Sequence, residues 1–437
     1  MPKIAFIGAG SIVFAQNLLV DILSFPEHGG STIALMDIDE RRLANITDLA
    51  KKIVAQEGYE AKIQATTDRR VALRGADYVI FMFQVGGLDA YARDVEIPLR
   101  YGINQAVGDT LGPGGVFRAL RTIPVIFDIC RDMTELCPDA LLMNYVNPMA
   151  INCWALYKAF PDLKSIGLCH SVQETSADIA RYIDAPCDEI SFKCAGINHM
   201  AWFLEYKWKG KDAYPILKER CHDQEIYKKD AIKFEILRYF GYFVTESSYH
   251  MSEYVPYYRK HAEWIEKVKN IDSWLKYSEG SYFKLCRDLA AHDDELFKSA
   301  INAEKVSVTR THEYASYIIN AVETGRRVVV NGNVENRGLI TNLPEGCCVE
   351  VPCVFEPSGI MPTIIGDLPA QLAALNRSNI NVQELAVLGV LTGEKDAIYQ
   401  AVMMDPYTSS VLTLPEIYSM VTDLFAAHNG LLPQVSW

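Results

Sequence analysis

The sequence predicts an α/β fold, a Rossmann-like doubly wound parallel sheet followed by a docked α+β, mainly helical domain. Three observations lead to this prediction. Apolar runs of strand length alternate with helical runs over roughly the first 170 residues, the pattern of a parallel sheet covered by helices. The first of these runs ends in a glycine-rich turn. Near residue 195 the pattern changes to polar–apolar alternation and then to charged helical runs, so we expect two domains, 1–195 and 196–437.

The first apolar run begins a unit with the pattern of a dinucleotide-binding βαβ motif. A strand at Lys3–Ile7 leads into a turn that contains Gly8 and Gly10, and a helical run follows from Ser11 to Leu23. Glycines let the backbone approach a pyrophosphate, whose charge is favoured by the free amides at the start of the helix. Gly8, Gly10 and Ser11 are therefore predicted to bind a cofactor. The alternative is a simple tight turn.

A second strand, Thr32–Met36, ends in Asp37, where a carboxylate can accept hydrogen bonds from both ribose hydroxyls of a dinucleotide. A carboxylate there would repel a 2′-phosphate, so we expect NAD rather than NADP. Val13 replaces the third glycine of the G-x-G-x-x-G pattern, so the first helix should pack slightly farther from the strand. Asp77–Phe83 is the next buried strand, and Gln84 directly after it is predicted to join the cofactor site.

The segment Gly108–Gly115 carries much glycine beside polar side chains, including Asp109. This composition suits a loop that closes over a ligand, and it equally suits a flexible connection. We expect Asp109 to contact substrate. The remaining elements of this half are a helix at Leu120–Met133 and strands at Leu141–Val146 and Ser165–Leu168.

Two polar clusters follow the last two strands of this series, Asn144 with Asn147 and Cys169 with His170 and Ser171. Ligands collect beyond the carboxyl ends of parallel strands, so we expect a site where these clusters meet. Asn147 would place an amide near a nicotinamide or a substrate hydroxyl. It can equally cap the helix that follows.

Cys169 and His199 are side chains that together could hold a divalent metal and leave most coordination positions open to substrate. Both lie in polar loop contexts after successive strands, CHS and NHM. The alternative for each is a buried core residue without a ligand. His170 could be a ligand, a general acid or a surface residue, and sequence spacing does not choose among these roles.

The second half shows several further patterns. They are alternating strands at Glu189–Lys193 and Ala201–Lys207, the longest helical run at Trp264–Ala291, strands of a second sheet at Arg327–Val330 and Cys348–Phe355, and a helical region at Ala370–Ala426. The segment Ser247–Lys260 is dense in tyrosine, which is typical of a core or an interface. A tyrosine beside a metal-bound oxygen can also ionise more easily and act as a base.

The composition argues against several kinds of partner. A net charge of -13, with no long run of lysine and arginine, makes nucleic acid a poor partner. No stretch reaches the roughly 18 apolar residues of a membrane helix, and the start has the pattern of a strand rather than a signal peptide. Eleven cysteines lie scattered in apolar contexts, which indicates reduced thiols and a cytoplasmic location.

Nearly the whole chain resembles glycoside hydrolase family 4, the NAD- and metal-dependent glycosidases that depart from the two-carboxylate scheme. The resemblance is carried by FIGAGS, ALMDID, GDTLGPGG, NYVNPM, GLCHS, GINHM and SEYVPYY, and continues in NLPEGCCVEV and MMDP. The nearest subgroup is the bacterial α-galactosidases that act on unphosphorylated, melibiose-type sugars, in which CHS stands at the metal site. The resemblance implies NAD and Mn²⁺ as cofactors and an α-glycoside as substrate. We also expect a homodimer or homotetramer.

The resemblance also implies residue roles. Cys169 and His199 match the manganese ligands. His170 matches the proton donor to the leaving group, a position that is aspartate in relatives acting on 6-phospho-sugars. Tyr254 matches the base, and Asn147 matches a substrate-binding asparagine.

Gly8, Gly10 and Asp37 match the dinucleotide site of the family. His312 departs from the family pattern, because close relatives have arginine just before the EYAS run. If that arginine contacts the sugar, specificity here has shifted within the α-glycosides, toward an α-glucoside or an α-galacturonide. His312 is therefore expected, with Asp109, among the substrate-binding residues.

The mechanism that the resemblance implies is a redox-assisted elimination. NAD takes hydride from sugar carbon three, and the metal polarises the oxygens on carbons two and three. Tyr254 removes the proton from carbon two, and His170 protonates the departing group. Water then adds and the same cofactor returns its hydride, so the net reaction is hydrolysis.

Two rival functions remain open from the sequence. One is a dehydrogenase of lactate or malate type, in which Arg118 or Arg121 would clamp a substrate carboxylate. The other is a non-catalytic NAD-sensing protein, for which the Cys169–His199 pair and Tyr254 would be incidental. Net release of NADH with substrate would favour the dehydrogenase.

Overall fold

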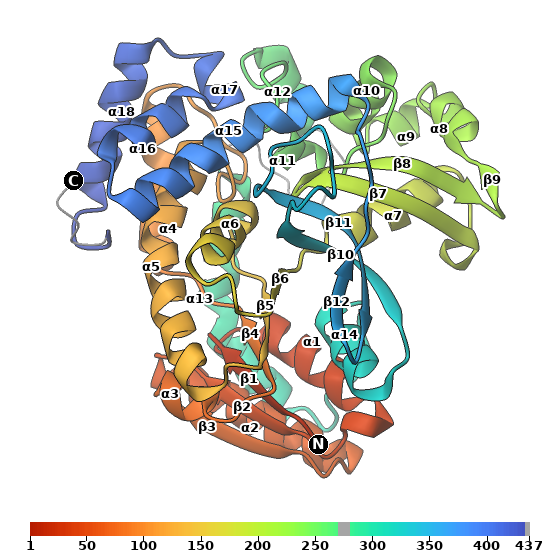
Figure 1. Ribbon diagram of the computed structural model, residues 1–437, viewed down its shortest axis with the longest axis vertical. Helices are drawn as coiled ribbons and strands as arrows, with labels where there is room; N and C mark the ends of the chain where they lie inside the picture. Colours follow the sequence, from red (N-terminus) through yellow and green to blue (C-terminus); the bar gives the residue numbers. More distant parts are fainter. Residues whose placement is uncertain (270–279, 433–437) are drawn as a thin grey trace.

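The computed structural model describes residues 1–269 and 280–432. The strands of this part form one mixed sheet in the order β3-β2-β1-β4-β5-β6-β10-β11-β7-β8-β9, with β12 paired to β11 (Figure 1). The strands from β1 to β6 pair in parallel, and those from β7 to β12 join antiparallel. The order 3-2-1-4-5-6 is that of the doubly wound dinucleotide-binding fold. The predicted fold class is therefore confirmed.

The elements have the following bounds. The strands are β1 Lys3–Ile7, β2 Thr32–Met36, β3 Lys62–Thr66, β4 Tyr78–Phe81, β5 Leu141–Asn144, β6 Ser165–Gly167, β7 Ile190–Ile197, β8 Met200–Trp208, β9 Lys211–Asp212, β10 Val328–Glu335, β11 Cys348–Glu356 and β12 Gly359–Pro362. The helices are α1 Ile12–Leu23, α2 Glu40–Glu57, α3 Arg69–Leu73, α4 Gly87–Arg100, α5 Gly112–Leu136, α6 Met149–Ala159, α7 Ser171–Tyr182, α8 Tyr214–Arg220, α9 Gln224–Tyr227, α10 Ala231–Phe240, α11 Ser248–Met251, α12 Ala262–Lys269, α13 Ser281–Asn302, α14 Tyr314–Thr324, α15 Ala370–Thr392, α16 Lys395–Met403, α17 Pro406–Ser409 and α18 Leu414–Ala427. Short 3₁₀ turns lie at Pro26–His28 and Cys187–Glu189.

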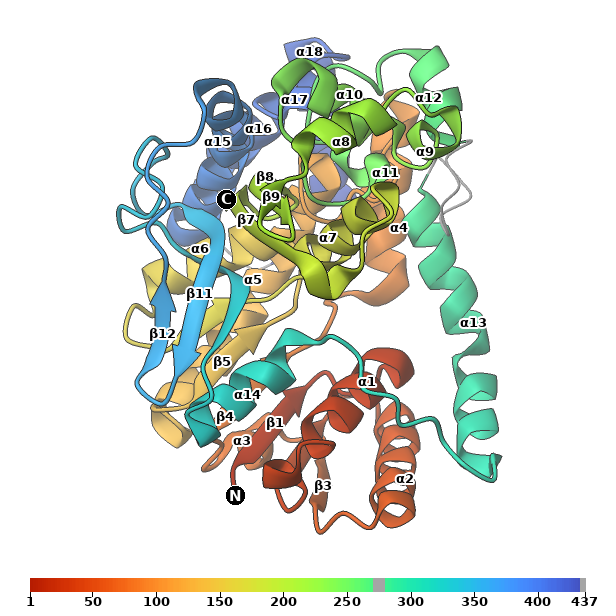
Figure 2. The ribbon, with the colours of Figure 1, turned by 90° about the vertical axis from the view of Figure 1, so that its right-hand side faces the viewer.

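Alternate residues of the parallel strands face two layers of helices, as the period of two along a strand requires. In β1, Ile4 and Phe6 belong to an apolar cluster that includes α1 and α2. Ala5 and Ile7 belong to a second cluster with the later turns of α5. Helices α1 and α14 pack together on one side of the parallel strands (Figure 2). Covered on both faces, these strands are continuous apolar runs, which is why they were recognisable from sequence.

The expectation of a second sheet is wrong. Strands β10 and β11 extend the first sheet, because β10 pairs with β6 through Asn333 and Gly167, and β11 pairs with β7 through Glu350 and Gly196. Short pairings of this kind leave no trace in the pattern of a single strand. The expected domain division at 195/196 falls inside β7 and stays a prediction.

The glycine-rich segment is only partly a loop. Gly112–Gly115 forms the buried first turn of α5, so the expected closing loop is shorter than predicted. A methyl group on Gly115 would lie 2.5 Å from the carbonyl carbon of Thr110, and one on Gly114 would overlap the carbonyl oxygen of Gly108. These glycines let the segment 108–111 pack directly on the helix.

The rest of the second half follows the predicted pattern with two differences. Strands β7 and β8 form the expected antiparallel hairpin, and α15 to α18 occupy the expected helical region. The helical run Trp264–Ala291 falls on α12 and α13, and its residues 270–279 lie outside the described residues. Val13 is 59% exposed, so it does not separate the first helix from the strand as expected. No helix in the described part is long and apolar enough to cross a membrane.

Candidate active site

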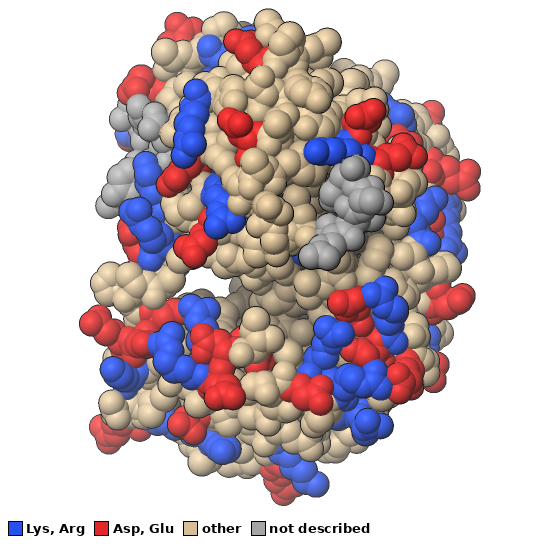
Figure 3. Space-filling view, turned by 90° about the vertical axis from the view of Figure 1, so that its left-hand side faces the viewer, with Lys and Arg blue, Asp and Glu red and all other residues tan. Residues whose placement is uncertain are grey.

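Of the polar residues predicted after the strands, Asn147, Cys169 and His170 lie in one region of the molecule. Asn144 does not join them, because its buried side chain donates to the carbonyl and accepts from the amide of Val146. Strand β6 leads through Leu168 to Cys169 and His170, directly before α7. The β7–β8 hairpin carries His199 in its tight turn, and the chain of pairings from β6 through β10 and β11 to β7 brings that turn beside β6. On the face drawn in Figure 3, the surface is hollowed across its middle, between the levels of the first three strands and of the C-terminal helices.

The residues expected to bind the dinucleotide lie together at the ends of β1 and β2, and their role in cofactor binding stays a prediction. Gly8 has φ +89°, and a methyl group on it would lie 2.6 Å from Cβ of Phe83. The Gly10 amide donates to Asp37 Oδ2 at 2.7 Å, so the carboxylate holds the turn in place. Ser11 is the N-cap residue of α1, and its side chain makes no capping hydrogen bond. The turn therefore has the bare, closely packed backbone that a pyrophosphate needs.

Gln84 follows β4 and is the next residue after Phe83, which packs against Gly8. Its side chain is exposed, and its Nε2 donates to the carbonyl of Gly87 at 3.1 Å. The structure thus places Gln84 at the carboxyl edge of the sheet without a contact to Gly8, Gly10 or Asp37 among its hydrogen bonds. Its role as a cofactor-binding residue stays a prediction.

Cys169 and His199 are in contact, with Cys169 Sγ 3.2 Å from His199 Nε2. Burial alone would raise the pKa of the Cys169 thiol, but the charge of His199 and the hydrogen bond to it lower this pKa to about 7. Burial lowers the pKa of His199, whereas Glu246 and Cys169 raise it to about 10. Glu246 Oε2 lies 3.4 Å from His199 Nε2. The pair therefore favours a thiolate beside a charged imidazole.

The Cys169–His199 pair fits a divalent metal. A metal bonded to sulfur at about 2.3 Å and to nitrogen at about 2.1 Å would place these atoms at neighbouring positions of one coordination shell. No group of three or more His, Cys, Asp and Glu side chains that could hold a metal occurs among the described residues. A metal held by this pair alone would keep its other positions for substrate oxygens. His199 also has positive φ, +63°, a conformation that a β7–β8 turn of two residues imposes and that aims its ring at Cys169.

His170 is held by a carboxylate that the sequence did not reveal. Its Nε2 lies 2.7 and 2.8 Å from the two carboxylate oxygens of Glu313, which directly precedes α14. Burial alone would lower the pKa of His170, but Glu313 raises it to about 9. The ring also stacks on Tyr145 and meets Phe14 of α1 edge-on. His170 is thus a charged donor fixed between α1 and the Cys169 side of the site.

Tyr254 lies near His199, with 6.2 Å between the two ring centroids. Only 2% of Tyr254 is exposed, and burial raises the pKa of its phenol well above the usual value. Its hydroxyl lies 2.8 Å from Thr110 Oγ1, which in turn lies 2.6 Å from His250 Nε2. The sequence pointed to Tyr254 but not to Thr110 or His250.

The expected substrate-binding residues are divided by the structure. Asn147 Nδ2 donates to Asp109 Oδ2 at 3.1 Å, and Arg118 Nη1 lies 3.6 Å from the same oxygen. Asp109 Oδ1 is buried without a hydrogen-bond partner in the described structure and lies 4.0 Å from His250 Nε2, and the role of Asp109 in substrate binding stays a prediction. His312 is exposed, next to Glu313 in the chain, and its role stays a prediction.

The residues that sequence reasoning missed stood inside motifs that it had singled out. Thr110 is part of GDTLGPGG, His250 lies two positions before SEYVPYY within the tyrosine-rich segment Ser247–Lys260, and Glu313 begins EYAS. Their partners lie more than 100 residues away in the chain, so only the fold shows the pairs. The available signal was a polar side chain in or next to a motif that was already identified.

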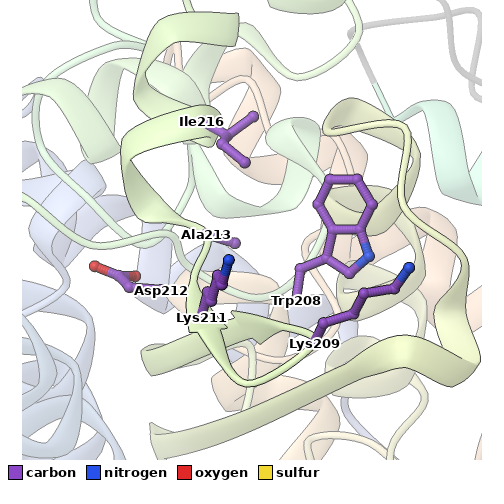
Figure 4. A pocket seen from close by; sticks show the side chains of 6 residues that line it. All are labelled: Trp208, Lys209, Lys211, Asp212, Ala213 and Ile216. Carbon is purple, nitrogen blue, oxygen red and sulfur yellow. The ribbon is translucent and has the colours of Figure 1, made fainter.

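A separate cavity of about 330 Å³ lies at the β8–β9 hairpin (Figure 4). It is lined by Trp208, Lys209, Lys211, Asp212, Ala213 and Ile216. None of these residues belongs to the cluster around Cys169 and His199, so this cavity is not part of the candidate active site.

Fold and side-chain geometry together define a class of protein: a Rossmann-fold protein with a glycine-rich turn after β1 and a contacting Cys–His pair that fits a metal. Comparison with known protein families gives the family. The model of the family 4 glycosyl hydrolases matches residues 3–185, and the model of the family 4 glycosyl hydrolase C-terminal domain matches residues 194–408. The chain belongs to the family 4 glycosyl hydrolases, as the resemblance implied, and is a hydrolase.

Known proteins are similar to this chain over nearly its full length. An alpha-galactosidase of Bacillus subtilis (strain 168) is 44% identical over 436 residues, 99% of this chain and 100% of the relative. An alpha-galactosidase of Rhizobium meliloti (strain 1021) is 37% identical, over 99% of this chain and 89% of the relative. The structure of the 6-phospho-beta glucosidase from Thermotoga maritima with manganese, NAD⁺ and glucose-6-phosphate has a TM-score of 0.81 at 22% identity, covering 98% of this chain and 99% of that chain.

Family membership settles the choice among the rival functions in favour of a hydrolase. The geometry agrees, because Arg121 is fully buried and forms a two-pronged pair with Asp94, and Arg118 pairs with Asp109. A dehydrogenase of lactate or malate type would need such an arginine for its substrate carboxylate.

Proposed function

We propose that the chain hydrolyses unphosphorylated α-galactosides of the melibiose type with the help of NAD and a divalent metal ion, Mn²⁺. The substrate is supported by the alpha-galactosidases that match nearly the whole chain. The cofactors are supported by the similarly folded glucosidase structure that holds manganese and NAD⁺. The observation that carries the proposal is the 3.2 Å contact between Cys169 and His199, next to His170 and close to Tyr254.

In this proposal Cys169 and His199 hold the metal, and Gly8, Gly10 and Asp37 hold the dinucleotide. When bound, NAD takes and later returns a hydride at sugar carbon three, while the metal polarises the oxygens on carbons two and three. A carbonyl at carbon three acidifies the hydrogen on carbon two. The chain's own side chains then have to move two protons.

Tyr254 removes the proton from carbon two. This role is supported by the position of its ring beside His199, one of the proposed metal ligands. Asp109 and Asn147 hold sugar hydroxyls on this side, through the free Oδ1 of Asp109 and the amide of Asn147. Fixed orientation of this kind supplies much of the rate gain in elimination chemistry.

His170 protonates the departing oxygen on carbon one. Glu313 accepts from one ring nitrogen, Nε2, so Nδ1 is the nitrogen that we propose donates to the leaving group. A charged imidazole next to Glu313 is ready to give a proton at neutral pH. Water then adds to carbon one, and Tyr254 returns a proton to carbon two as the reaction closes.

The test is an assay of a nitrophenyl α-galactoside with NAD, Mn²⁺ and a reductant, each left out in turn. We expect nitrophenol release only when all three are present, with no net accumulation of NADH. Full turnover in EDTA without NAD would contradict the proposal. Nitrophenyl α-glucoside, α-galacturonide and galactoside 6-phosphate, assayed in parallel, decide whether the exposed His312 accompanies a shift to another α-glycoside.

Two further expectations about the enzyme are part of the proposal. All eleven cysteines are free thiols, which fits a reducing, cytoplasmic compartment. We also propose a homodimer or homotetramer, and sedimentation of the purified protein measures this directly. A monomer at working concentration would contradict the second expectation.

A further inference from the structure

Tyr254 has a difficulty as a base that the geometry around it resolves. A protonated phenol cannot remove a proton, so Tyr254 must give up its own hydroxyl proton to act as a base. A phenol that is 2% exposed has little contact with bulk water, so the first acceptor available to its proton is a neighbouring protein group. Another group must therefore accept this proton before, or while, the substrate is deprotonated.

A continuous chain of hydrogen bonds leads away from the phenol. Tyr254 Oη lies 2.8 Å from Thr110 Oγ1, and Thr110 Oγ1 lies 2.6 Å from His250 Nε2. His250 Nδ1 lies 2.8 Å from Glu253 Oε2. Thr110, His250 and Glu253 are all buried, so the chain is shielded from competing water.

When the His250 ring is neutral, the far end of the chain sets the direction of its hydrogen bonds. Glu253 accepts from the backbone amides of Ala106, Val107 and Gly108, which makes it an anchored carboxylate. A carboxylate accepts and does not donate, so Nδ1 of His250 carries the hydrogen. In the neutral ring, Nε2 must then be an acceptor.

With His250 Nε2 as an acceptor, Thr110 donates to it through its only hydroxyl hydrogen. The Thr110 oxygen is then left to accept from Tyr254, which donates. All hydrogens point the same way, from Tyr254 through Thr110 toward His250. This is the arrangement that a transfer of the phenol's proton requires.

We propose that Thr110 and His250 form a relay that takes the proton from Tyr254 and so makes it the base of the reaction; this rests on the proposed function. The Tyr254 proton passes to Thr110 Oγ1 as the Thr110 proton passes to His250 Nε2. His250 becomes charged opposite the Glu253 carboxylate, and Tyr254 becomes a phenolate.

The phenolate takes the proton of carbon two, and the electron pair of that C–H bond forms the double bond as the leaving group departs from carbon one. When water has added, Tyr254 returns a proton to carbon two. The proton on His250 then travels back through Thr110 to the phenolate. Atoms and charges are thus restored at the end of each turnover, and Thr110 acts as a positioning residue that touches no substrate.

The test compares Thr110→Val, which breaks the relay, with Thr110→Ser, which keeps the hydroxyl. In deuterated buffer with NAD and Mn²⁺, we expect Thr110→Val to lose solvent exchange at carbon two and kcat by roughly 100-fold or more, the usual contribution of a positioned acid or base. Thr110→Ser should stay within about tenfold of the unchanged enzyme. Hydride transfer to NAD in a single turnover, and KM, should change little in either variant.

Several outcomes would overturn the relay. One is exchange at carbon two in Thr110→Val at the rate of the unchanged enzyme. Another is an equal loss of hydride transfer and of exchange, because that pattern indicates a merely structural role. If Thr110→Val does not fold, His250→Gln replaces it, because Gln can bond to Thr110 but cannot take up its proton; unchanged exchange there would reject the relay. An unchanged enzyme with neither NAD-dependent hydrolysis nor exchange would reject the proposed function, and the relay with it.

Discussion

His170 and Glu313 show how one side chain decides the state of another. His170 immediately precedes α7, where the helix dipole disfavours a positive charge, and its side chain is about one-third exposed. Both oxygens of Glu313 lie within 2.8 Å of its Nε2, and they outweigh these opposing effects. Without this carboxylate the imidazole would lose both its charge and its orientation.

The pair leads to a prediction about leaving groups. Glu313→Gln should lower kcat/KM for melibiose by roughly 100-fold, because an unactivated sugar needs the full help of the acid His170. A nitrophenyl α-galactoside, whose leaving group needs little protonation, should lose much less. The measurement is the ratio of the two kcat/KM values, with the exposed Glu304→Gln as control. Equal losses on both substrates would remove Glu313 from the acid side of the reaction.

Short elements show where sequence reasoning succeeds and where it fails. The strands β1, β2 and β4 were predictable because both their faces are buried and each is a bounded apolar run. The helical conformation of Gly112–Gly115 was not predictable, since glycine is a poor helix former. Only the close packing of this turn against Thr110 explains why glycines stand at these positions.

The residues of the candidate site likewise include some that the sequence predicts and some that it does not. Cys169, His199 and Tyr254 were predictable from residue type and from the motifs around them. His250 and Glu313 were not, because each gains its meaning from a partner more than 100 residues distant. A motif predicts which segments meet, and the register of the sheet decides which side chains touch.

The start of helix α17 carries a prediction about pH. Asp405 caps this helix, accepting from the amide and the hydroxyl of Thr408 at 2.8 and 2.6 Å. Burial raises the pKa of Asp405 to about 6, above the value near 3.9 that is expected in the unfolded chain. A pKa raised on folding means that ionisation opposes folding, so this carboxyl favours the fold most below about pH 4 and its contribution is lost as pH rises through about 6.

Asp405→Asn keeps the cap but cannot ionise. Its free energy of unfolding relative to the unchanged protein should therefore rise by about 2 kcal/mol between pH 4.5 and pH 7.5, the part of the roughly 3 kcal/mol from a two-unit pKa difference that falls in this range. Urea unfolding at the two pH values measures this. The exposed Asp396→Asn is the control and should show no such pH dependence. A difference that stays constant with pH would contradict the prediction.

Across the whole molecule, the continuous sheet places the proposed metal ligands on different segments. Cys169 follows β6 in the parallel part, and His199 lies in the β7–β8 turn of the antiparallel part. A metal that joins them ties the two parts of the sheet together in the folded state only. Its binding should therefore stabilise the fold as a whole.

Mn²⁺ at about 100 times its Kd should add about 2.7 kcal/mol to the free energy of unfolding, which raises Tm by roughly a few degrees. Removing the metal with EDTA should reverse this shift. Cys169→Ser should weaken the response, since a hydroxyl is a poorer ligand than a thiolate. The exposed Cys187→Ser is the matched control and should respond like the unchanged protein. A full Mn²⁺ response in Cys169→Ser, measured by thermal unfolding, would exclude Cys169 as a ligand.

The continuous sheet also matters for anyone who recombines this enzyme with its relatives. The β6–β10 and β11–β7 pairings join distant stretches of the chain in one sheet. A crossover at 195/196 would therefore cut β7 in two and pair strands from different parents at both of these contacts. Exchanged blocks should instead keep β6, β7, β10 and β11 from one parent. A change of substrate preference can then be introduced while the sheet that positions the reactive groups stays intact.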